Sequence, residues 1–286
     1  MIKKIFTLFV GITTISSCTI QEEVSITDTG SVDYVQRIEM PQMAALMGAA
    51  DMDEKIEMNQ ISNTEYNYID FLEKMKSFGS TSSTVKSGEF ENFALYKDEL
   101  KAIDFVKFRL DMRDNFAFEV INRAKSVDEF NSNSGIVDNT FADIKIKEEA
   151  RIAKILAEET PKEKRKRLKK GEELPSAMFG DNPLSNFSSM KYSFDGKSFS
   201  KAIDAEKYLK AMKLEEEQSE EDQQIFSGML KQMKFKYKYT FPRKIKSLDI
   251  KDAMFTSDGK SFIKEYSLDE FLKDPKVGEF KVELED

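Results

Sequence analysis

Three stretches of the chain follow one pattern that restricts the fold strongly: an alternating apolar strand, a short polar turn, a second strand and then a helix. The first stretch alternates over 106–120 around a turn at Asp114-Asn115. Ser126 and Glu129 follow with the spacing of a capping box, in which these two side chains satisfy the first backbone amides of a helix. The pattern predicts a hairpin with one buried face, followed by a short helix.

The pattern returns twice with an Asp-Gly turn, which supplies the positive φ angle that a tight hairpin requires. Residues 190–199 alternate around Asp195-Gly196 and lead into a helix at about 204–213. Residues 253–262 alternate around Asp258-Gly259 before a second capping box at 267–270. The octets 195–202 and 258–265 are identical at six of eight positions. Two explanations stay open, a repeated hairpin-and-helix unit or one turn solution used twice.

Further segments add both strands and helices. Aromatic residues alternate with lysines over 234–241 until Pro242 ends the strand, and 280–284 alternates as a terminal strand. Helices are predicted at about 52–78, 144–159, 161–170 and 203–233. Because strands and helices do not alternate regularly, we expect an α+β fold. Its antiparallel sheet would be built from hairpins, each followed by a short helix, with additional longer helices.

The first residues predict an exported chain. Lys3 and Lys4 precede an apolar run, Ile5 to Ile15, that has the length of a signal-peptide core and is too short to span a bilayer. The sequence Ile15-Ser16-Ser17-Cys18 then resembles the lipobox of bacterial lipoproteins, in which an aliphatic residue and two small residues precede an acylated cysteine. The resemblance implies that Cys18 is lipidated and that its acyl chains hold the protein to a membrane. The alternatives are an ordinary secretory peptide and a buried N-terminal helix.

These features divide the chain into a signal peptide (1–17), a polar lipidated tether (18–30) and an exported α+β domain (31–286) with a possible helical, charged excursion at 142–186. Thr19, rather than aspartate, follows the cysteine. In lipoproteins of two-membrane bacteria this resemblance implies sorting to the outer membrane, on its periplasmic side or at the cell surface. Gln21-Glu22-Glu23 resembles the acidic surface-export tag of Bacteroidetes lipoproteins.

Composition excludes several kinds of chemistry. Cys18 is the single cysteine, and the chain has no histidine and no tryptophan. These absences exclude intrachain disulfides, Ser-His-Asp triads and metal sites built on imidazole, and they leave no cysteine nucleophile elsewhere. Removal of Lys3 and Lys4 with the leader takes the formal net charge from −8 to −10. Such an acidic chain disfavours nucleic acid as a partner.

Two clusters have both a functional and a structural interpretation. Seven of the nine residues in 162–170 are basic and could contact anionic headgroups. A solvated helix, a flexible excursion or pairing with the acidic stretch 215–222 explains the same run, and we favour these explanations. The methionines of 40–58 could suggest Cu(I), but the apolar residues between them indicate core or an adaptable hydrophobic surface. We therefore expect no metal and no cofactor.

Other motifs have ordinary explanations. Gly-Lys-Ser occurs at 196–198 and 259–261, but without the upstream glycine of a phosphate-binding loop and between strands instead of before a helix. The lysine and aromatic residues of 234–241 fall on opposite faces, as in a half-buried strand. The acidic pairs Asp51 with Asp53 and Asp111 with Asp114 are explained by a charged surface.

The region from Phe241-Pro242 to Lys260 resembles the LppM-type domain of bacterial lipoproteins, in which a strand ending in Phe-Pro precedes a hairpin. That resemblance implies a binding module. We therefore expect a non-catalytic, membrane-anchored envelope lipoprotein that binds a protein or lipid component of the envelope or serves as an accessory subunit. The alternatives are a carboxylate-based hydrolase acting on envelope glycan or polymer, and a lipid carrier.

Overall fold

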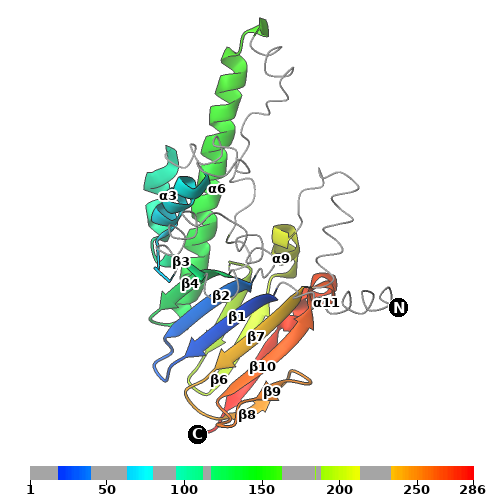
Figure 1. The fold of residues 1–286 in the computed structure, drawn as a ribbon. Coiled ribbons are helices and arrows are strands. Elements are labelled where there is room, and N and C mark those ends of the chain that lie inside the picture. Colours follow the sequence, from blue (N-terminus) through cyan, green and yellow to red (C-terminus); the bar gives the residue numbers. More distant parts are fainter. Residues whose placement is uncertain are drawn as a thin grey trace, which may run out of the picture.

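Two β-sheets form the centre of the protein in a computed structural model that describes residues 19–39, 63–79, 95–111, 117–162, 184, 188–212 and 233–286 (Figure 1). The larger sheet has seven strands. In spatial order they are β3 (Val106–Asp111), β4 (Ala117–Ala124), β2 (Val32–Glu39), β1 (Thr19–Ile26), β7 (Lys234–Thr240), β10 (Ser261–Ser267) and β9 (Met254–Phe255). The smaller sheet has four strands, β5 (Met190–Phe194), β6 (Ser198–Ile203), β11 (Phe280–Leu284) and β8 (Ile245–Leu248).

The α+β class is confirmed, and the pairing of the strands refines the expectation of an antiparallel sheet. The four-stranded sheet is antiparallel throughout. In the seven-stranded sheet, β1 and β7 run parallel, with Thr19 beside Lys234 and Ser25 beside Thr240. The larger sheet is therefore mixed, because β1 and β7 come from segments far apart in the chain and are not the two arms of a hairpin.

The expected tether at 18–30 was wrong from Thr19 onward. Thr19–Ile26 is strand β1, which pairs with β2 on one side and with β7 on the other. Alternate residues of β1 are buried, including Ile20 and Val24, and Thr27 and Gly30 form the turn to β2. The folded domain therefore includes Thr19–Ile26 and does not begin at residue 31.

Five helices are described. They are α3 (Tyr68–Gly79), α5 (Lys97–Leu100), α6 (Val127–Glu158), α9 (Ala205–Met212) and α11 (Leu268–Lys273), together with the 3₁₀ turns η2 (Lys101–Ile103) and η3 (Pro275–Gly278). The capping box is confirmed, since the Ser126 hydroxyl accepts from the Glu129 amide at 3.1 Å and the Glu129 carboxylate accepts from the Lys125 amide. The expected short helix is instead the first part of the 32-residue α6, which extends away from the sheets (Figure 1).

Burial of one face explains why α6 continues. Val127, Phe130, Val137, Phe141 and Ile144 are buried at helical spacing. The helix continues through weak helix formers such as Asn131, Ser132 and Gly135, because packing of an apolar face outweighs local propensity. The helix candidate at 144–159 is therefore the distal half of the same helix.

Both Asp-Gly hairpins are confirmed. Gly196 and Gly259 have φ angles of 89° and 68°. Strands β5 and β6 lead into α9, and β9 and β10 lead into α11, whose N-cap Ser267 accepts from the Glu270 amide at 3.1 Å. The two Gly-Lys-Ser sequences thus lie in turns between strands. The two units belong to different sheets.

Aromatic side chains fill the space between the two sheets. Tyr239 of β7 lies 5.8 Å from Phe199 of β6, 4.7 Å from Phe280 of β11 and 5.5 Å from Phe262 of β10, between ring centroids. Helix α6 extends this layer, since Phe130 lies 5.4 Å from Tyr34 of β2. The inner face of the large sheet is therefore covered by the small sheet and by α6.

Several sequence predictions lie outside the described residues. They concern Cys18, the methionines of 40–58, Asp51 and Asp53, Asp114, most of the basic run after Lys162, and the acidic stretch 215–222. The helix predicted from residue 52 is described only from Asn63, and it begins at Tyr68 after a bridge between Tyr66 and Phe108. Of the helices described, none combines the length and the apolar character that crossing a membrane requires.

Candidate functional site

A fully buried ion pair lies between the two sheets. Glu22 of β1 and Lys201 of β6 have side chains with 0% exposure, and the Lys201 Nζ lies 2.6 Å from the Glu22 Oε1. Both residues occupy inward positions of their strands, where their neighbours two residues away are apolar. Each charge therefore interrupts an otherwise hydrophobic strand face at the point where the sheets meet.

Tyrosines surround this pair. The Tyr239 hydroxyl donates to the Glu22 Oε1, and the Tyr192 hydroxyl lies 3.4 Å from the same oxygen and 3.1 Å from the Tyr239 hydroxyl. The Lys201 ammonium lies 3.8 Å from the centroid of the Tyr237 ring, a cation–π contact. One carboxylate oxygen thus accepts from an ammonium and from phenols on two facing sheets.

Burial governs the protonation of the cluster. Burial lowers the pKa of Lys201 to about 8, although the Glu22 carboxylate acts in the opposite direction. Burial and then the charge of Glu22 raise the pKa values of Tyr192, Tyr237 and Tyr239 well above 10. The phenols therefore remain neutral hydrogen-bond donors at neutral pH.

The cluster is incompletely hydrogen-bonded. Among the described residues, the Glu22 Oε2 and the Tyr237 and Tyr208 hydroxyls have no hydrogen-bond partner. A lysine with a lowered pKa beside a carboxylate is a proton-transfer pair in chemical terms. Because neither side chain is exposed, the arrangement as described joins β1 to β6 and fixes the position of one sheet on the other.

A second charged cluster lies on the opposite, outer face of the large sheet. Arg109, Glu119 and Arg37 stand side by side on β3, β4 and β2. The Arg37 Nη1 contacts the Glu119 carboxylate at 2.6 Å and the Asp111 carboxylate at 3.1 Å, and Glu39 accepts from the Arg37 Nε. Asp111, explained from the sequence as charged surface, is only 7% exposed and belongs to this network. Asp111 and Glu119 share one guanidinium, so the two carboxylates are held as ion-pair partners.

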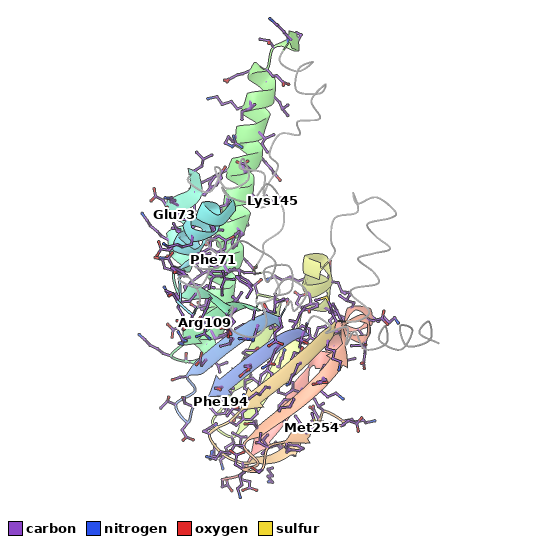
Figure 2. The ribbon with its side chains drawn as sticks, in the orientation of Figure 1. Phe71, Glu73, Arg109, Lys145, Phe194 and Met254 are labelled. Carbon is purple, nitrogen blue, oxygen red and sulfur yellow. The ribbon has the colours of Figure 1, made fainter. Side chains whose placement is uncertain are left out.

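A third feature is apolar and exposed. Met254 and Phe255 form the edge strand β9, with exposures of 58% and 55%. In Figure 2, Met254 lies at the β9 edge, away from Phe194 and Arg109. In the described strands, no other two adjacent large hydrophobic side chains are as exposed to solvent.

Sequence reasoning did not identify Glu22 and Lys201 as partners. The signal was present in each strand: Glu22 stands in phase with Ile20 and Val24, and Lys201 stands in phase with Phe199 and Ile203. Opposite charges at the inward positions of two strands indicate a buried pair, since an unpaired buried charge is costly. The described residues contain no cluster of acidic side chains suited to a metal ion.

The chain has no match among protein-family models, among curated proteins or among solved structures.

Proposed function

We propose that the protein is a membrane-anchored envelope lipoprotein, lipidated at Cys18, whose folded domain is a non-catalytic binding or accessory module. The observation that carries this proposal is the position of β1. Cys18 directly precedes Thr19, and Thr19 is already the first residue of a central strand. Acylation at Cys18 would therefore attach the sheet to a bilayer without an intervening flexible segment.

The chemistry of the described charged groups supports a binding role over a catalytic one. Glu22 and Lys201 are enclosed between the sheets. Asp111 and Glu119 are engaged by Arg37. Catalytic carboxylates have to reach substrate, and these groups are instead used within the fold. The proposed partner is a protein or lipid component of the envelope, and the proposed location is the outer membrane.

The test is metabolic labelling with a palmitate analogue in wild type and in Cys18→Ala, followed by membrane fractionation. The expected result is label and membrane association in wild type and the loss of both in the variant. Ser17→Ala is the matched control, because a small residue remains before the cysteine, and it is expected to keep the label. An unlabelled, soluble wild-type protein would refute the proposal.

A second step identifies the binding partner and the membrane. Wild type and Cys18→Ala are crosslinked in whole cells and recovered through the same affinity tag, and membranes are separated by density. Specific co-recovery of an envelope component with wild type but not with Cys18→Ala is expected, in the outer-membrane fraction. Recovery in the inner-membrane fraction would contradict the proposed location.

A further inference from the structure

The exposed apolar residues Met254 and Phe255 lie at one margin of the large sheet. They form β9, which pairs with β10 on one side through Phe255 beside Phe262 and Met254 beside Ile263. On its other side β9 has no strand among the described residues. Because successive strand residues point to opposite faces, the two side chains project on both sides of the margin.

The segment of the chain that contains β9 is basic, although the chain as a whole is acidic. Residues 243–264 contain six lysine or arginine side chains and three aspartates, a net charge of +3 in a chain of −8. Lys246, Lys251 and Lys260 are exposed. Asp258 is engaged in its own turn, where it accepts from the Lys260 amide at 3.0 Å and from the Thr256 hydroxyl at 2.6 Å.

The strand register relates β9 to the start of β1. Met254 stands beside Ile263, which stands beside Lys238, and Lys238 aligns with Glu23. Glu23 is four residues from Thr19, which amounts to about 13 Å along the strands, and β9 is three strand spacings away, about 14 Å across. The two points are therefore about 20 Å apart, with Thr19 at the α11 end of the sheet and β9 toward the opposite end of β10 (Figure 1).

We propose that Met254 and Phe255 insert into the interface of the bilayer that carries the anchor, with the neighbouring lysines on anionic headgroups. The inference rests on the proposed function and adds a second contact to it. Aromatic and thioether side chains enter the acyl boundary, and lysines extend to the headgroups around them. Each such lysine adds attraction to an anionic surface.

A bilayer fits this margin better than a protein strand does. Strand β9 has two residues, so an added strand would gain few main-chain hydrogen bonds. Its two side chains project to opposite faces of the sheet, so a protein partner would have to contact both faces at once. The net positive charge of 243–264 also opposes pairing with the same surface of a second copy.

Tryptophan fluorescence tests the proposal directly, because the chain contains no tryptophan. The full protein carrying Phe255→Trp is purified from membranes and reconstituted into vesicles of phosphatidylcholine with phosphatidylglycerol. Leu95→Trp is the control, since Leu95 is also 55% exposed and precedes α5, which packs near the β3 side of the fold. We expect a blue shift and quenching by brominated lipid for Trp at 255 and neither for Trp at 95.

A second measurement separates this proposal from the lipid anchor. The Cys18→Ala protein is added to the same vesicles, and its binding is measured by sedimentation with them. In this background, Met254→Asp with Phe255→Asp is expected to weaken vesicle binding about tenfold, whereas Leu95→Asp leaves it unchanged. An acylated, vesicle-bound protein with unchanged emission at 255 would overturn the insertion and leave the anchor standing. If Cys18 proves unacylated, the proposed function fails, and the added-protein assay alone decides the insertion. A blue shift that depends on protein concentration without vesicles would indicate a second copy as the partner and would also overturn the proposal.

Discussion

Substitution of Lys201 by methionine is expected to destabilise the fold strongly. The variant keeps the length of the side chain between β6 and the ring of Tyr237 but leaves the Glu22 carboxylate buried without its cation. Breaking a buried pair on one side costs about 3–5 kcal/mol. The Glu22 Oε1 keeps the Tyr239 hydroxyl donor, so we expect the lower end, about 3 kcal/mol.

That cost is measurable because a domain of this kind has a free energy of unfolding of about 5–15 kcal/mol. Urea unfolding of wild type and Lys201→Met, followed by circular dichroism at pH 7 and fixed salt, gives the difference from the shift in midpoint. The double variant Glu22→Gln with Lys201→Met removes both charges but keeps an acceptor for Tyr239. It is expected to lie within about 1.5 kcal/mol of wild type. With Glu22→Gln as the other single variant, the cycle then gives a favourable coupling between the two sites of about 1.5 kcal/mol or more.

Lys264→Met is the matched control. Lys264 occupies the same place in the second octet as Lys201 in the first, and its Nζ lies 5.3 Å from the Tyr266 ring centroid. Since it is only partly buried, its loss is expected to cost less than about 1 kcal/mol. If Lys201→Met also costs less than about 1 kcal/mol and the double variant is additive, the account of a buried, unhydrated pair is refuted.

Four further outcomes are expected. The pKa of Lys201 is about 8 in the folded chain and about 10.4 in the unfolded chain, so between these pH values the unfolded chain binds one proton more. The free energy of unfolding should therefore rise from about pH 8 to pH 10.4. Urea titrations of Lys201→Met should lack this increase. Above about pH 10 the buried tyrosines ionise only in the unfolded chain, so the free energy of unfolding should fall. The absorbance of ionised phenol at alkaline pH tests this, and exposed phenols that titrate normally in the folded protein would contradict it. Gly278→Ala places a Cβ within 3.0 Å of the Tyr237 hydroxyl and of the Phe271 ring and should cost about 1–3 kcal/mol in the same unfolding assay, whereas a neutral result would contradict the close approach. Ser126→Ala removes the acceptor of the Glu129 amide and should cost about 1 kcal/mol, with Ser126→Asp as the variant that restores it.

The local parts of the fold were predictable from the sequence, and the long-range parts were not. Turns such as Asp195-Gly196 are determined by neighbouring residues, so the hairpins, their helices and the buried face of β7 could be predicted. The parallel pairing of β1 with β7 joins residues such as Glu23 and Lys238, which are 215 positions apart. Alternation identifies a strand face but does not identify its neighbour.

The same limit explains the candidate site. Glu22 and Lys201 are 179 positions apart, and each looks like an ordinary surface charge in its own segment. Glu22 also interrupts the apolar alternation of β1, and this made residues 19–26 resemble a polar tether. An unpaired charge costs free energy only once the two strands have packed together and buried it. The pair thus could be inferred only from the inward phase of both strands together.

The location of Glu22 also bears on whether Gln21-Glu22-Glu23 can serve as an export tag. Gln21, Glu22 and Glu23 resemble a surface-export tag, yet in the folded chain all three lie in β1. Glu22 is enclosed with Lys201, and Glu23 accepts from the Lys238 Nζ at 3.2 Å on the outer face. A receptor that reads this triplet would have to displace a central strand from both of its neighbours. Recognition of the triplet as a tag is therefore compatible with this fold only before β1 joins the sheet, whereas the proposed acylation of Cys18 would not require β1 to leave the sheet.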